Sequence, residues 1–230
     1  MSSQHASPAR HGSSSASATH AQAQPGLARA VIVTRRSELE VMLERHGTFG
    51  QAEFFLASRG DSIAPYVEAH ERLRSVCRSV DGILPPEQRR ARVDRDDLER
   101  FLFAPDDLII IIGQDGLVPN VAKYLREQLV IAINPDPLRY DGVLCRHSLE
   151  TFPRIVAWLN RPSDAYAIQK RPLAHAQQSD GQRILALNEV FVGHRTHQSA
   201  RYRISTGDAA ERHSSSGLIC STGTGCTGWA

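Results

Sequence analysis

Residues 108–116 decide the fold; they read Leu-Ile-Ile-Ile-Ile-Gly-Gln-Asp-Gly. A short, continuous run of aliphatic residues, most of them β-branched, favours a strand that is buried on both faces, as in a parallel sheet. The run stops at the segment 113–116, whose two glycines allow a tight turn and a close approach of the backbone to a ligand. The stretch therefore predicts a buried strand that ends at a ligand-binding turn.

A helix and a second buried strand are expected directly after this turn. The apolar residues of 117–125 recur at helical spacing, and residues 129–133, Leu-Val-Ile-Ala-Ile, repeat the buried-strand pattern. Strand, turn, helix and strand form a βαβ unit, whose turn lies where open α/β sheets bind ligands and where helix amides favour phosphate. Asp115 would lie beside such phosphates, where it could hold a metal or accept a proton. The alternative is that Gly-Gln-Asp-Gly is only a turn.

The residues before this unit extend the α/β pattern. Residues 1–28 contain no acidic residue and few large apolar ones, so we expect a disordered tail. Residues 30–34 predict the first strand. Ser37 and Glu40 have the spacing of a capping box, which predicts a short helix ending at Gly47. Further helices are expected over residues 50–58 and 61–80.

A dense run of mixed charges occupies residues 87–100. We interpret it as a solvated face, with Asp94 capping a helix whose Leu98, Phe101 and Leu102 point inward. The alternative is a basic lip that guides nucleotide phosphates.

The pattern of apolar residues and turn signals changes near residue 161. After a helix expected over 148–159, short apolar runs at 165–168, 184–192, 200–205 and 218–220 are separated by turn signals, an antiparallel β pattern. We expect a disordered tail (1–28), an α/β nucleotide-binding domain (29–147) and a β-rich domain (148–230).

Composition limits the classes of partner. The net charge of +2 gives no strong attraction to nucleic acid or to an anionic membrane. No apolar run approaches the ~20 residues of a membrane span. The cysteines are scattered and form no Cys-x-x-Cys pair, which favours a reducing cytoplasm. The composition does not decide whether the chain forms a homo-oligomer.

Four motifs resemble, in order and rough spacing, those of the NAD kinase family. The family carries Gly-Gly-Asp-Gly-Thr, Gly-Ile-Asn, Asn-Asp or Asn-Glu, and Thr-Pro-Thr-Gly-Ser-Thr-Ala-Tyr. The matching segments here are 113–117, 132–134, 188–189 and 222–229. The letters depart in places, which indicates a divergent member: Gln114 replaces a glycine, Leu117 a threonine, Gly223 a proline, Cys226 a serine and Trp229 a tyrosine. The family continues past the last motif, so we expect a C-terminally truncated chain.

The resemblance implies a Rossmann-like parallel-sheet domain followed by the start of a β-rich, sandwich-like domain. It implies transfer of a phosphoryl group from ATP, or a similar donor, to the 2′-hydroxyl of the adenosine ribose of NAD, giving NADP with Mg²⁺ or another divalent cation. Asp115 would be the catalytic base. Residues matched to nucleotide binding are Gly113, Gly116, Asn134, Asn188, Glu189, Thr222, Thr224, Gly225 and Thr227.

Gln114 is added to these binding residues, because its amide donors could turn onto a phosphate oxygen. Other readings stay open at the matched motifs. Asn188 and Glu189 could form a capped turn, and the Thr/Gly loop could be a flexible linker. Two further functions are alternatives: a related kinase acting on a sugar or lipid hydroxyl, and a catalytically weak nucleotide-binding regulator.

Overall fold

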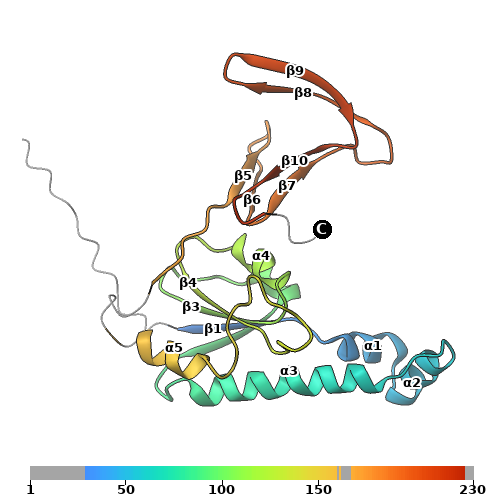
Figure 1. Ribbon diagram of the computed structural model, residues 1–230, viewed down its shortest axis with the longest axis vertical. Helices are drawn as coiled ribbons and strands as arrows, with labels where there is room; N and C mark the ends of the chain where they lie inside the picture. Colours follow the sequence, from blue (N-terminus) through green and yellow to red (C-terminus); the bar gives the residue numbers. More distant parts are fainter. Residues whose placement is uncertain (1–28, 160, 162–166, 226–230) are drawn as a thin grey trace, which may run out of the picture.

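The computed structural model describes residues 29–159, 161 and 167–225, which form an α/β domain and a β-rich region (Figure 1). The expected tail, residues 1–28, lies outside the described residues. A parallel sheet has the strand order β2-β1-β3-β4. The strands are β1 (Ala30–Thr34), β2 (Arg90–Asp94), β3 (Leu108–Ile112) and β4 (Leu129–Ile133). The fold class is thus confirmed, and β1, β3 and β4 match the predicted strands.

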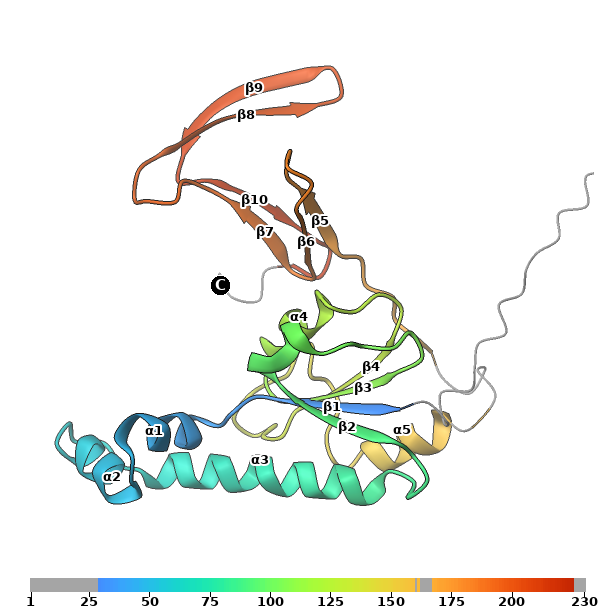
Figure 2. The same ribbon diagram turned by 180° about the vertical axis from the view of Figure 1, so that it is seen from behind.

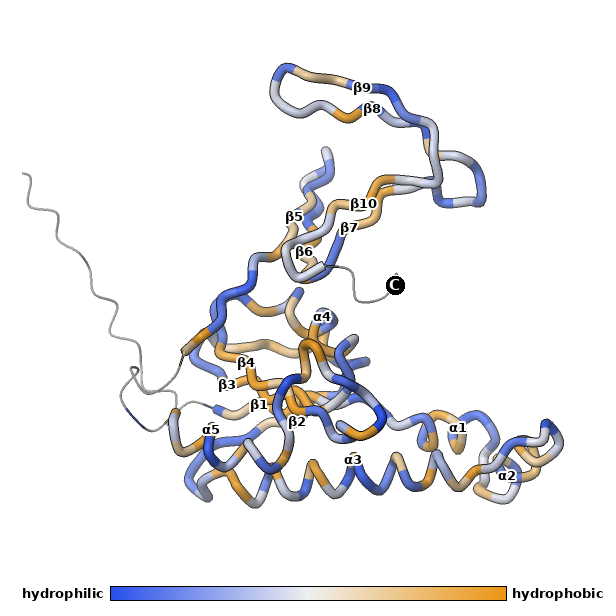
Figure 3. Tube along the Cα trace, in the orientation of Figure 1, coloured by the Kyte–Doolittle hydropathy of each residue, from blue (hydrophilic) through white to orange (hydrophobic). Residues whose placement is uncertain are grey.

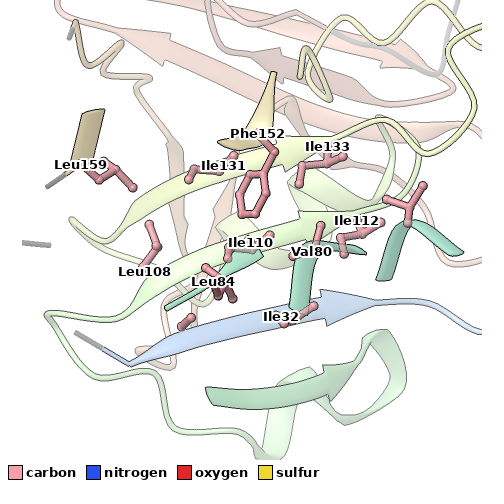
Figure 4. Packing of buried hydrophobic residues seen from close by; sticks show 12 residues of the cluster. Ile32, Val80, Leu84, Leu108, Ile110, Ile112, Ile131, Ile133, Phe152 and Leu159 are labelled. Atoms are coloured by element: carbon pink, nitrogen blue, oxygen red, sulfur yellow. The ribbon is translucent and has the colours of Figure 1, made fainter. Parts of the chain in front are cut away.

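β3 is buried along its whole length because helices cover both faces of the sheet. Ile110 and Ile112 pack with Val80 of α3 (Ala64–Ile83) and Phe152 of α5 (Phe152–Leu159) (Figure 4). On the opposite face, Ile109 and Ile111 pack with Leu117 and Val121 of α4 (Leu117–Ala122). The hydropathy colouring of Figure 3 shows β3 and β4 as apolar segments of this domain. A strand with apolar neighbours on both faces has no polar alternation, which explains the continuous run.

α1 (Glu38–His46) and α2 (Phe49–Ala57) pack against the start of α3, beyond the edge of the sheet (Figure 2). The predicted capping box is confirmed: the Glu40 amide donates to Ser37 Oγ (3.2 Å) and the Ser37 amide donates to Glu40 Oε2 (2.8 Å). Gly47 ends α1 with a φ of 79°. β1 therefore leads directly into a well-anchored helix at the carboxyl edge of the sheet.

The charged run proved to be more than a solvated face. Residues 90–94 form β2, and residues 95–100 form the 3-10 helix η2 (Arg95–Arg100), capped by Asp94, which accepts the Asp96 amide (3.0 Å). The expectation for Leu102 was wrong, because its side chain is 88% exposed, whereas Leu98 is buried. β2 is an edge strand in which only Val93 is buried, and its charged side chains hide the strand pattern.

α5 packs on the sheet through Phe152 and Leu159, so the structure groups it with the α/β domain although the sequence suggested a boundary at residue 148. α4 ends at Ala122, earlier than the expected residue 125. No helix among the described residues is long and apolar enough to cross a membrane.

The β-rich region contains three antiparallel strand pairs. They are β5 (Ala174–Gln177) with β6 (Arg183–Ala186), β7 (Glu189–Val192) with β10 (Leu218–Ser221), and β8 (Ala200–Thr206) with β9 (Ala209–Ser215). The strand expected at 165–168 is not found at residues 167 and 168, and residues 165 and 166 lie outside the described ones. β9 was missed because its sequence is largely polar and exposed, and β5 was missed because Ala-His-Ala-Gln is short and has no β-branched or aromatic residue.

Candidate functional site

The carboxyl edge of the parallel sheet contains a topological switch point between β1 and β3. The chain leaves β1 for β2 on one side and returns to β3 on the other. Open α/β sheets bind ligands at such points, outside the carboxyl ends of the strands. Arg35 follows β1 and Gln114 follows β3, and Arg35 Nη2 donates to Gln114 Oε1 (3.4 Å). The hydrogen bond spans the switch point, and it leaves the Gln114 amide nitrogen free to donate elsewhere.

The glycines of the 113–116 turn have ordinary backbone angles. Among the described residues, the glycines with positive φ do not include Gly113 or Gly116. A Cβ on Gly116 would meet nothing within 4 Å, whereas one on Gly113 would lie 2.9 Å from Cδ2 of Leu117, a buried side chain that would have to shift. The backbone conformation therefore does not require glycine at either position. Gly116 leaves open space beside the turn, and Gly113 leaves room for the buried Leu117 side chain.

Backbone hydrogen bonds link the start of α4 to the preceding turn. The Leu117 amide donates to the Gln114 carbonyl (2.9 Å) and the Val118 amide to the Asp115 carbonyl (3.1 Å). Leu117 itself is buried against the sheet, which explains why an apolar residue stands where the resembled family has threonine. Within the described residues, the amides of Gln114, Asp115 and Gly116 donate no hydrogen bond. These three N–H groups, rather than the helix itself, are available to a phosphate.

The Asp115 carboxylate is held by the loop that follows β4. Oδ2 accepts the Val143 amide (2.7 Å), and Oδ1 accepts the amides of Leu144 and Cys145 (both 2.8 Å). Three backbone N–H groups donate to the carboxylate and occupy most of its lone pairs. In this conformation Asp115 anchors the loop. Accepting a proton from a substrate hydroxyl would require that loop to release at least one carboxylate oxygen.

Asn134 and Gly142 build the same loop from within. Asn134 is only 4% exposed; its Nδ2 donates to the Tyr140 carbonyl (2.7 Å), and its Oδ1 accepts the Asp136 amide (3.0 Å). Gly142 has a φ of 66°, and a Cβ there would lie 2.5 Å from the Cys145 carbonyl oxygen and 2.9 Å from Asn134 Nδ2. Asn134 thus supports the loop in this structure instead of pointing a free amide at a ligand. Gly142 was missed as a site residue, although Asp-Gly is a turn signal.

Cys145 lies beside Asp115 and has no nucleophilic role at neutral pH. Burial, and then the negative charge of Asp115, raise the pKa of its thiol to about 12. The thiol therefore stays protonated, and its part in the site is to pack beneath the loop.

The second group of predicted residues is brought together in the β-rich region. β7 and β10 pair so that Ser221 lies opposite Glu189, and the Thr222 amide donates to the Asn188 carbonyl (2.8 Å). Thr222 Oγ1 donates to the Leu187 carbonyl and accepts the Thr224 amide (3.1 Å). The Thr/Gly loop is therefore folded onto the Asn188-Glu189 segment as far as Gly225. Thr227 lies outside the described residues.

The described residues contain no group of three or more His, Cys, Asp or Glu side chains arranged to hold a metal ion. Mg²⁺ in phosphoryl transfer is usually held by one or two carboxylates together with substrate phosphates, so it needs no such cluster. The carboxylate that fits this pattern at the switch point is Asp115, subject to release of its loop.

The protein combines an α/β domain, which carries the switch-point site, with a β-rich region, in which the Thr/Gly loop is folded onto the Asn188-Glu189 segment. No family model matches the chain. It is 28% identical over 251 aligned residues to "NAD kinase 2, mitochondrial" of Rattus norvegicus, covering 88% of this chain and 59% of that protein. The corresponding protein of Homo sapiens is 28% identical over 252 residues, covering 88% and 57%. These similarities support a divergent member of the NAD kinase family. The chain spans less than three fifths of the length of either relative.

Proposed function

We propose that this chain is a phosphotransferase that converts NAD to NADP, with ATP or a similar nucleotide as donor. The observation that carries the proposal is the folding of residues 222–225 onto the Asn188-Glu189 segment, which unites two motifs that are far apart in sequence. The 28% identity to two NAD kinases is consistent with the same reaction.

In the proposed reaction the ribose 2′-hydroxyl oxygen attacks the terminal phosphorus of the donor. The bond from that phosphorus to the bridging oxygen breaks, ADP leaves, and the hydroxyl proton passes to Asp115. Catalysis of this kind depends mainly on positioning and charge neutralisation. The amides of residues 114–116 would hold phosphate oxygens, and bound Mg²⁺ would neutralise the charge that develops on them. Loop 143–145 must release Asp115 before the proton transfer.

A binding role without turnover is the second candidate, and the state of Asp115 favours it. All three loop amides donate to the carboxylate in this structure, so the proposed base is occupied. A regulator would bind nucleotides while keeping this arrangement.

For the cellular compartment we propose the cytoplasm, because the cysteines are scattered along the chain. The names of both relatives place those proteins in mitochondria.

NADP formation tests the proposed function. We expect NADP from NAD, ATP and Mg²⁺, measured with an NADP-specific dehydrogenase, together with NAD binding measured by titration calorimetry. Sugars and diacylglycerol serve as competing acceptors. NAD binding without NADP formation would support the regulator. Phosphorylation of a sugar or a lipid in place of NAD would overturn the substrate assignment.

Gln114→Gly should weaken donor binding by about 1–2 kcal/mol, roughly five- to thirtyfold in Kd, if the Gln114 amide nitrogen donates to a phosphate oxygen. Arg35 orients this side chain by donating to its Oε1, so the nitrogen is directed away from Arg35. Titration of ATP into the wild type and the variant measures the effect. The regulator hypothesis predicts the opposite sign, because glycine would open the turn, and tighter ATP binding in Gln114→Gly would contradict our assignment.

A further inference from the structure

A groove of about 340 Å³ lies next to the switch point, on the β2 side. α1 and α2 form one wall, and the connection from β2 into η2 forms the other. β1 leads straight into α1 (Figures 1 and 2), so the groove begins where β1 ends. Its basic side chains are Arg35, Arg36, Arg45 and Arg95. None of these was among the site residues expected from the sequence.

The four arginines differ in how far they are already engaged. Arg36 is committed, since Nη1 pairs with Glu44 and Nη2 with Asp96 (2.7 Å). Arg35 makes only long contacts, to Gln114 (3.4 Å) and to Glu38 (4.0 Å). Within the described residues, the side chains of Arg45 and Arg95 form no hydrogen bond or ion pair. Three guanidinium groups therefore retain donors for an anion.

The carboxylates of the groove do not cancel these groups. Arg36 pairs with Asp96, and Asp94 accepts the Asp96 amide at the start of η2. Four arginines line the groove against the three carboxylates of Glu38, Asp94 and Asp96, which leaves a net positive charge. Glu38 is largely exposed and reaches Arg35 only at 4.0 Å. The groove is therefore positive where Arg45 and Arg95 face it, and Arg35, which also lines it, contacts Gln114 of the glycine turn.

Phe55, an aromatic side chain that lines the groove, is already covered by two neighbouring side chains. His46 lies 4.3 Å from the Phe55 ring, between centroids, and the Arg59 guanidinium lies 3.8 Å from the same centroid. With two groups packed on it, the Phe55 ring is poorly placed to stack on a nucleobase. The groove therefore matches a phosphate chain better than it matches a base.

We propose that this groove binds the triphosphate chain of the donor nucleotide, with Arg45 and Arg95 as phosphate ligands and Arg35 at the end nearest the site of transfer. This inference rests on the proposed function. Among residues 87–100, for which a basic lip was one interpretation, the inference selects Arg95, and it adds Arg45 from α1. Guanidinium groups suit phosphate because their paired N–H donors match two phosphate oxygens.

The test measures the binding of ATP and of inorganic tripolyphosphate to Arg45→Ala, Arg95→Ala and the double variant by titration calorimetry. Each single change should raise both dissociation constants about five- to tenfold, and the double change by more. Arg89→Ala is the matched control, because Arg89 is an exposed arginine directly before the amino end of β2, away from the groove. NAD affinity should be unchanged in all four proteins.

Since Arg45 and Arg95 are exposed, both variants should fold, and melting temperatures within a few degrees of the wild type verify this. ATP and tripolyphosphate constants within twofold of the wild type in the double variant would overturn the groove assignment. Weakened ATP but unchanged tripolyphosphate would also overturn it, since the phosphate chain would not be the recognised part. If NADP forms and these variants keep the wild-type KM for ATP, the groove fails while the function stands. If the variants bind ATP and tripolyphosphate more weakly but the wild type forms no NADP, the groove assignment stands and the proposed function fails.

Discussion

Asp115→Asn should lower the rate of NADP formation about a hundredfold or more, because the amide cannot accept the hydroxyl proton. The structure adds a second consequence. Asn can still accept two loop amides through Oδ1, but its NH₂ group would face the Val143 amide, so two donors would meet. We therefore expect a loss of stability of about 1–3 kcal/mol.

Three measurements separate the two effects of Asp115→Asn: kcat, the Kd for NAD, and the free energy of unfolding. Loss of kcat with NAD binding largely kept is the expected result. A variant with wild-type kcat would remove Asp115 from the mechanism. A variant that loses kcat and NAD binding together would indicate that the loop, and not the proton transfer, was damaged.

Gly142→Ala should destabilise the protein by about 2–5 kcal/mol, by combining the cost of a left-handed backbone with that of overpacking. Its new Cβ would lie 2.5 Å from the Cys145 carbonyl oxygen, a backbone atom that can yield only if the loop moves. Denaturant unfolding measures the loss. Gly60→Ala is the matched control, because Gly60 has a φ of 75° but nothing within 4 Å of the added Cβ. A loss in Gly142→Ala no larger than in Gly60→Ala would contradict the tight loop.

Gly142→Ala also tests what Asp115 does, since it disturbs the loop and leaves the carboxylate unchanged. If Asp115 is the base and the loop must open, the residual kcat of folded Gly142→Ala should stay within about tenfold of the wild type, far above that of Asp115→Asn. Equal losses of kcat in both variants would show that Asp115 acts by anchoring residues 143–145. Asp115 would then be a positioning residue.

The site could be predicted only in part. Residues 113–116 were recognised as a turn at the carboxyl edge because a buried strand precedes them and a helix follows. The contact of Asn188 with Thr222 was not readable from local pattern, since it depends on the pairing of β7 with β10. Arg45 belongs to a helix that looks like an ordinary capped surface helix, and only the packing of α1 beside η2 shows that Arg45 and Arg95 share a groove.

Elements with local signals can be read from the amino-acid sequence alone. Continuous apolar runs specified β1, β3 and β4, most of whose residues lie in the two cores that flank the sheet, and Ser37 with Glu40 specified the start of α1. That residues 90–94 form a strand is visible only after folding, because Val93 is the one buried residue in it and the exposed arginines leave no apolar pattern to mark it. The tertiary structure alone placed Arg35 against Gln114 and loop 143–145 on Asp115. Such hydrogen bonds join residues that are distant along the chain, and they exist only once the sheet brings its carboxyl ends together.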